Sequence, residues 1–146
     1  MSTAIHRRVA ACRAAADPTC IARLASGWAV MGDPQVLPGY CLLLPDPVVP
    51  HLNALDPAAA AVFLADMARL GQAVLEVTGA VRINYAMFGN LEPALHAHVF
   101  PRHDDEPPHL RTAQPWAYDW TAARRFDARE DGPRLAALRE RLLKPA

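Results

Sequence analysis

The stretch that decides the fold is Ala94-Leu95-His96-Ala97-His98-Val99-Phe100-Pro101-Arg102. Successive side chains of a strand point to opposite faces, so His96 and His98 share one face, with Cα atoms about 7 Å apart. Leu95, Ala97 and Val99 point to the other face, where a covering helix would lie. Proline cannot donate to a ladder, so we expect Pro101 to end a strand over residues 95–100.

The longest helix is predicted upstream of this strand. Asp56 suits the N-cap and Pro57 the first helical position, and Gly79 supplies the stop. Apolar residues recur between these signals at spacings of three and four, which gives the helix one apolar face.

The other segments favour an α+β fold, because the strands can pair as neighbours and the helix needs a sheet face to cover its apolar side. Residues 81–88 alternate like a strand, and the short apolar runs 27–31 and 40–44 indicate a hairpin through residues 32–39. Short helices are expected at both ends, over residues 3–16 and 134–144. Residues 103–133 are rich in proline and tryptophan, and we expect them to be mostly irregular.

Composition excludes several classes of protein. The 146 residues fit one domain, and 52% hydrophobic with 21% charged residues excludes wholesale disorder. Fifteen basic and fifteen acidic residues give no net charge, which argues against general nucleic-acid binding. Three cysteines do not form a secreted disulfide framework, and no apolar run approaches the roughly 18 residues of a membrane span. We therefore expect a cytoplasmic protein with no membrane or nucleic-acid partner.

Three interpretations of His96 and His98 are open from their spacing alone. They are two surface histidines on a polar sheet face, or two metal ligands completed by His103, His109 or a carboxylate, or a nucleophile beside a proton donor. Spacing does not separate the last two.

The sequence resembles the histidine triad family over roughly residues 27–103. Residues 94–102 resemble the family's His-x-His-x-His signature, which is followed by two apolar residues and often Pro-Arg. Residues 39–45 resemble its Gly-His-x-Leu-hydrophobic-hydrophobic-Pro strand. His51, the long helix and Asn84 follow in the family's order. The resemblance implies a single domain over residues 1–146, with a core of about 27–103 and a tail over 104–146. It also implies an antiparallel sheet of about five strands with one long helix on a face.

Two departures from the family pattern stand out. Ala94 occupies the first triad position, and Tyr40 occupies the position of the histidine in the Gly-His pair. The family's middle histidine is the nucleophile and its ring is held by a backbone carbonyl, so the resemblance assigns that role to His96. The substitution at Ala94 leaves the nucleophile in place but alters what orients it.

By resemblance, the expected activity is nucleotide hydrolysis or nucleotidyl transfer at an α-phosphate through a nucleotidyl-histidine, as in dinucleoside polyphosphate hydrolases. His96 would attack phosphorus and His98 would contact the phosphate or the leaving group. His51, Asn84 and Arg102 would bind substrate. No resident metal or cofactor is implied, although Mg²⁺ can arrive with the phosphates.

The resemblance also implies a homodimer joined edge to edge. The alternatives are a non-catalytic nucleotide-binding module of the same fold and a metalloprotein that uses the two histidines as ligands. The aromatic cluster in residues 116–120 is expected either to close over a nucleotide base or to pack on a partner subunit.

Overall fold

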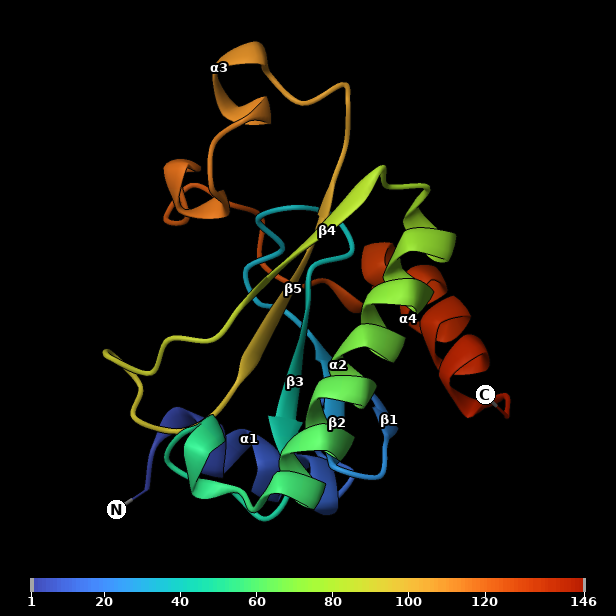
Figure 1. Ribbon diagram of the computed structural model, residues 1–146. Coiled ribbons are helices and arrows are strands. Elements are labelled where there is room, and N and C mark those ends of the chain that lie inside the picture. The colour runs from blue at the N-terminus through green and yellow to red at the C-terminus, as the bar shows by residue number, and fades with distance from the viewer. Residues whose placement is uncertain (1, 146) are drawn as a thin grey trace.

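The computed structural model describes residues 2–145 as one five-stranded antiparallel sheet with helices on both faces (Figure 1). The strands are β1 (Cys20–Arg23), β2 (Gly27–Met31), β3 (Cys41–Pro45), β4 (Arg82–Ala86) and β5 (Ala97–Arg102). Their order across the sheet is β1-β2-β3-β5-β4, and each neighbouring pair is antiparallel. The helical elements are α1 (Ala4–Arg13), η1 (Leu52–Ala54), α2 (Pro57–Thr78), α3 (Pro108–Arg111), η2 (Pro115–Ala117) and α4 (Ala128–Leu143). The predicted α+β fold is confirmed.

The predicted hairpin is β2 and β3, which pair in full register from Gly27 opposite Pro45 to Met31 opposite Cys41. Strand β1 was not predicted, because its four residues show no alternation of apolar and polar types. It forms by pairing with β2 across the turn at residues 24–27. A close backbone approach explains the glycine at position 27, where a Cβ would lie 1.9 Å from the carbonyl oxygen of Leu44.

Strand β5 continues through Pro101 to Arg102, so the prediction that proline ends this strand is wrong. The Arg102 carbonyl accepts a hydrogen bond from Val81, on the side of β4. Backbone groups of successive strand residues face alternate neighbours, so the nitrogen of Pro101 faces the side of β3. Because β3 pairs with β5 only as far as Val99, no β3 carbonyl there requires a donor.

Helix α2 covers one face of the sheet and has the predicted ends. The Asp56 side chain accepts a hydrogen bond from Ala59, and Gly79 adopts the left-handed conformation at φ 71°. Phe63, Leu70 and Val74 are fully buried in the core against the strands.

Contrary to the sequence expectation, α2 is long and apolar enough, by length and composition, to cross a membrane. The core helix of a compact domain passes the same test, and the buried residues of α2 belong to the same core cluster as residues of β2, β3 and β5.

Helix α4 packs beside α2 and places Leu135, Leu138 and Leu142 in the same hydrophobic core. It begins at Ala128, six residues before the predicted start, because the side chain of Asp127 caps its first turn.

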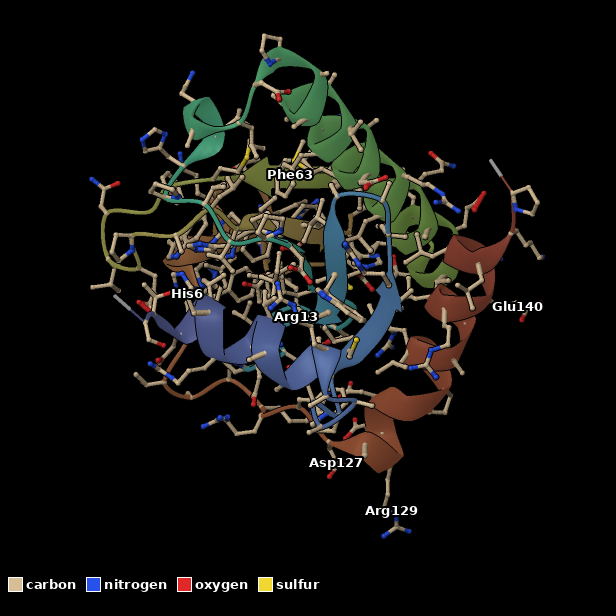
Figure 2. The ribbon with its side chains drawn as sticks, turned by 90° about the horizontal axis from the view of Figure 1, so that it is seen from below. His6, Arg13, Phe63, Asp127, Arg129 and Glu140 are labelled. Carbon is tan, nitrogen blue, oxygen red and sulfur yellow. The ribbon has the colours of Figure 1, made fainter. Side chains whose placement is uncertain are left out.

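Helix α1 covers part of the opposite face (Figure 2). It has Thr3 as N-cap and ends at Arg13, three residues before the predicted end.

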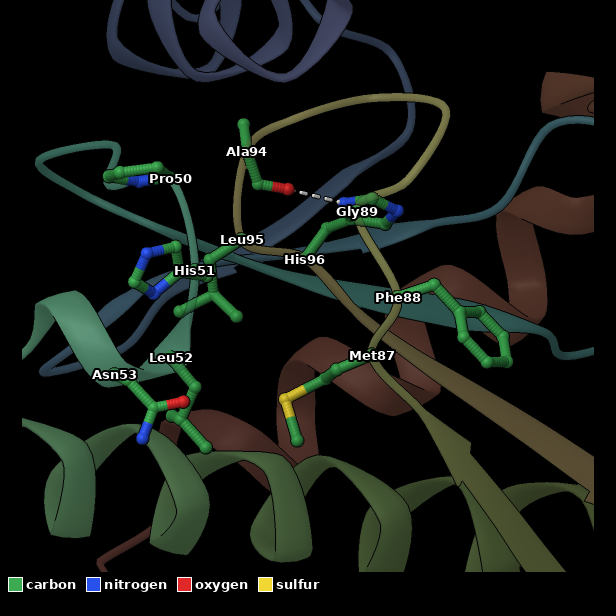
Figure 3. Close-up of a pocket in the computed structure, with 10 residues that line it drawn as sticks. All are labelled: Pro50, His51, Leu52, Asn53, Met87, Phe88, Gly89, Ala94, Leu95 and His96. Atoms are coloured by element: carbon green, nitrogen blue, oxygen red, sulfur yellow. Dashed lines mark hydrogen bonds between the residues drawn. The ribbon is translucent and has the colours of Figure 1, made fainter.

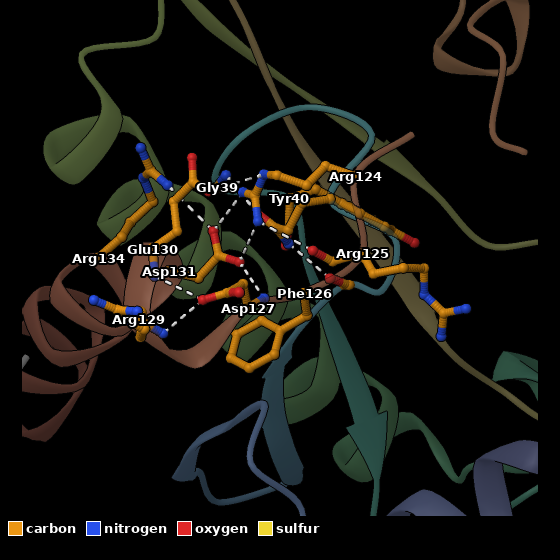
Figure 4. A network of polar contacts seen from close by, with 12 residues as sticks. Gly39, Tyr40, Arg124, Arg125, Phe126, Asp127, Arg129, Glu130, Asp131 and Arg134 are labelled. Atoms are coloured by element: carbon orange, nitrogen blue, oxygen red, sulfur yellow. Dashed lines mark hydrogen bonds and ion pairs between the residues drawn. The ribbon is translucent and has the colours of Figure 1, made fainter. Parts of the chain in front are cut away.

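The tail between β5 and α4 is fixed by buried charge. Asp131 is fully buried and accepts two hydrogen bonds from the Arg124 guanidinium, at 2.7 and 2.9 Å, and one from the Asp127 backbone (Figure 4). The Arg124 carbonyl in turn accepts from the backbone of Gln35. The segment is mostly irregular, as predicted, yet anchored along the sheet.

Candidate functional site

His96 lies one residue before β5 and is oriented by the backbone. Its Nδ1 lies 2.7 Å from the carbonyl oxygen of Ala94. A carbonyl only accepts, so Nδ1 carries the hydrogen and a neutral ring keeps its lone pair on Nε2. The preceding residue, Leu95, donates its N–H to the carbonyl of Val49, which explains why the strand begins later than the predicted residue 95. This arrangement leaves a lone pair on Nε2 of His96 without any polar side chain at position 94.

His98 stands beside His96, with ring centroids 5.0 Å apart. Its Nδ1 lies 2.6 Å from the Tyr40 hydroxyl, and Tyr40 is buried and stacked on Phe100. Burial, with the neighbouring His96 as a second cause, lowers the pKa of His98 to about 4. His98 is therefore neutral near pH 7.

The aromatic residues of the tail pack on this face of their own sheet. Trp116 meets the edge of His98 at 5.2 Å and stacks with Trp120, which contacts Tyr40 and Phe100. Trp120 is partly buried and packs against the hydrophobic cluster of this chain, so the expectation that the aromatic cluster packs on a partner subunit does not describe it. Trp116 remains partly exposed at the side of His98.

The structure places His51 and His96 in the lining of one pocket of about 240 Å³ (Figure 3). Residues 50–53, which lead from β3 toward α2, form one wall. Residues 94–96, which lead into β5, and residues 87–89, which follow β4, complete the lining. Segments far apart in the sequence thus bring two of the predicted site histidines together.

Arg102 and Asn84 do not reach this pocket. Arg102 is 6% exposed, forms an ion pair with Glu106 at 3.0 Å and donates to the side-chain oxygen of Asn84 at 2.8 Å. It also donates to the carbonyls of Leu110 and Ala113 in the tail. Protein acceptors take up the guanidinium donors of Arg102 in this arrangement, and the phosphate contact expected of Arg102 stays a prediction. Asn84 shares the site face but pairs opposite Phe100, beyond His98.

The metal-centre interpretation lacks a ligand set in the part of the chain that the structure describes. No three side chains of His, Cys, Asp or Glu lie close enough among residues 2–145 to hold a metal ion.

Tyr40 is the site residue that the sequence did not assign. A tyrosine at the start of an apolar run is typical of core packing. The available signal was its position directly after Gly39, where the resembled pattern carries a histidine.

Comparison with solved structures identifies the fold. A histidine triad protein from Bradyrhizobium japonicum is similar with 26% identity and a TM-score of 0.73, over 84% of this chain and 89% of that chain. A histidine triad protein from Marinobacter aquaeolei is similar over 97% of both chains, with 18% identity and a TM-score of 0.75. The chain has the histidine triad fold. A hypothetical histidine triad nucleotide-binding protein from Sulfolobus tokodaii also matches, with 12% identity and a TM-score of 0.72, over 92% of this chain and 89% of that chain.

No protein-family model and no curated protein matches the sequence. The histidine triad fold therefore rests on the structural similarity, and the roles of individual residues rest on their geometry.

Proposed function

We propose that the protein is a nucleotide hydrolase or nucleotidyl transferase that acts at an α-phosphate through a covalent bond to His96. The observation that carries this proposal is the hydrogen bond from His96 Nδ1 to the Ala94 carbonyl. It leaves the Nε2 lone pair for attack, in a pocket that His51 also lines. The nucleotide-binding name of the Sulfolobus tokodaii neighbour supports a nucleotide as the ligand.

The reaction takes two displacements at phosphorus. His96 Nε2 forms a bond to the α-phosphorus while the bond to the leaving atom breaks, and that atom takes the electron pair. The leaving atom is a phosphate oxygen in a dinucleoside polyphosphate and the amine nitrogen in a phosphoramidate. Water then attacks the same phosphorus and loses a proton to the solvent. The P–N bond breaks with its electron pair returning to His96 Nε2, and the nucleoside monophosphate is released. Covalent catalysis divides one difficult displacement into two easier ones. His98 would contact a phosphate oxygen or the leaving group, and His51 would contact the substrate within the pocket.

Dinucleoside polyphosphates and nucleoside phosphoramidates are the proposed substrate classes. The reaction needs no resident cofactor, and Mg²⁺ would enter bound to the phosphates. An edge-to-edge homodimer is part of the proposal, because β4 is an edge strand and its neighbourhood exposes Val81 and Tyr85.

The test is release of AMP from diadenosine tetraphosphate and from an adenosine phosphoramidate, measured for the wild type and His96→Ala. Loss of the nucleophile should reduce turnover by at least about a thousandfold. His109→Ala is the matched control, since His109 lies in α3 outside the pocket, and we expect it to retain wild-type turnover. Equal turnover of His96→Ala and the wild type would refute the proposal.

Alanine at position 94, where the resembled pattern has a histidine, favours a second candidate function, a non-catalytic nucleotide-binding module. That candidate predicts that AMP binds to wild type and His96→Ala while neither substrate is cleaved. Calorimetric titration of AMP alongside the turnover assay separates the two.

A further inference from the structure

Two hydrogen bonds decide where the protons sit on the paired histidines. The Ala94 carbonyl has no hydrogen to give, so His96 Nδ1 must be the donor in that 2.7 Å contact. The remaining nitrogen of a neutral His96, Nε2, is then unprotonated.

The contact between Tyr40 and His98 requires the opposite arrangement. Within residues 2–145, His98 Nδ1 is the one hydrogen-bond partner that the Tyr40 hydroxyl has, and Tyr40 is 3% exposed. If Nδ1 carried a hydrogen, the hydroxyl hydrogen would be buried without an acceptor, which is costly. The hydroxyl therefore donates to Nδ1, and the hydrogen of a neutral His98 is on Nε2.

The surroundings of His98 oppose a positive charge. The neighbours across the sheet are Leu42 on β3 and Ala86 on β4, and Trp116 of the tail covers the ring edge. His96 and Tyr40 are the titratable groups in contact with the ring, and neither is an anion at neutral pH, because burial raises the pKa of Tyr40.

More distant charges do not change this conclusion. Arg8 on α1 is a cation whose field reaches Tyr40, and a second cation at His98 would be repelled by it.

We propose that Ala94 and Tyr40 lock His96 and His98 in opposite neutral tautomers, with a lone pair on Nε2 of His96 and a hydrogen on Nε2 of His98. Tyr40 is then a positioning residue that acts through His98. The catalytic role of these tautomers rests on the proposed function, whereas the assignment of the tautomers does not. In the first displacement His96 Nε2 would bond to phosphorus while His98 Nε2–H donates a hydrogen bond to a phosphate oxygen, without transferring its proton.

The test is the ¹⁵N NMR spectrum of the full chain labelled at the imidazole nitrogens, recorded at pH 7 without ligand. Signals are assigned with His96→Gln and His98→Gln. We expect His96 to show a protonated Nδ1 and an unprotonated Nε2, and His98 to show the reverse. A protonated Nδ1 on His98, or an imidazolium spectrum, would overturn the proposal from the wild-type protein alone.

Tyr40→Phe removes the hydroxyl and keeps the ring that stacks on Phe100. We expect the two His98 nitrogen signals to move toward the average of exchanging tautomers, while the His96 signals stay unchanged. Tyr85→Phe is the matched control, because Tyr85 pairs opposite Val99 on the other face of the sheet. An unchanged His98 spectrum in folded Tyr40→Phe would contradict the role of Tyr40.

A kinetic readout separates this inference from the proposed function. If the nucleotidyl transfer occurs, Tyr40→Phe should lower kcat by about threefold to tenfold, the net effect of one neutral hydrogen bond, with little change in KM. Absence of turnover in the wild type would refute the proposed function and leave the tautomer assignment to be decided by NMR.

Discussion

Replacing Arg102 with methionine should loosen the tail without directly removing a substrate contact. Arg102 is the last residue of β5, and its guanidinium donates to Glu106, Asn84 and two tail carbonyls. Methionine keeps the apolar stem and removes the charge and every donor. Glu106, 8% exposed, would then be a buried carboxylate without its cation.

The expected loss follows from that burial. Removing one partner of a buried ion pair costs about 3–5 kcal/mol, because the other charge stays desolvated. Residues 103–126 can escape part of this cost by detaching from the sheet and hydrating Glu106. We therefore expect the free energy of unfolding to fall by about 3 kcal/mol, the lower end of that range.

Chemical denaturation followed by tryptophan fluorescence measures this loss, since Trp116 and Trp120 lie in the tail. Limited proteolysis locates it, and new cleavage is expected within residues 103–126. Arg82→Met is the matched control: Arg82 pairs directly opposite Arg102, is exposed and forms no ion pair within residues 2–145. The free energy of unfolding of Arg82→Met should stay within about 0.5 kcal/mol of the wild-type value.

A loss below about 1 kcal/mol for Arg102→Met with no new cleavage would refute the structural role, because a broken buried pair should cost several times more. Weaker nucleotide binding with unchanged stability would instead restore the phosphate-binding role that the sequence suggested.

Three further predictions concern the sheet, helix α4 and the buried acids. Gly27→Ala should destabilise by about 2–3 kcal/mol in chemical denaturation, because its Cβ would meet the Leu44 carbonyl at 1.9 Å. Gly132→Ala, inside α4 with open space around the Cβ, should instead stabilise by about 0.5–1 kcal/mol, and a loss there would contradict the account. Burial raises the pKa of Glu106 and Asp131, but hydrogen bonds from Arg102 and Arg124 outweigh it and hold both values below normal. A carboxyl whose pKa is lower in the folded than in the unfolded state stabilises the folded state above the unfolded pKa near 4, and this stabilisation is lost as the pH falls. The denaturant concentration at the unfolding midpoint should therefore decrease from about pH 5 toward pH 2. A midpoint that does not change with pH would contradict the buried pairs.

Local signals predicted the parts of the fold that depend on neighbouring residues. The ends of α2 follow from Asp56, Pro57 and Gly79, each of which acts within one turn of the helix. The hairpin of β2 and β3 follows from two apolar runs separated by a turn segment.

Pairing between distant residues explains what could not be predicted. Strand β1 has no pattern of its own and exists because β2 lies beside it. The pairing that defines β1 leaves no trace in the local sequence. The early start of α4 differs, because it follows from the Asp127 cap, a local signal that the prediction left out.

The same distinction applies to the candidate site. His96 and His98 are close because their positions differ by two along extended chain at the start of β5, and this spacing was visible in the sequence. Tyr40 reaches His98 from 58 positions away. Arg102 has the charge of a phosphate ligand, and its burial by residues 106–113 depends on how the tail folds back.

The mass of the intact protein after brief mixing with diadenosine tetraphosphate tests the central claim most directly. The reaction is quenched at neutral pH, because phosphohistidine is labile in acid, and wild type is compared with His96→Ala. The account predicts one adenylyl group on the wild type, mapped to His96, and none on the variant. An adenylyl group on another residue, or AMP formed equally by both proteins, would contradict it.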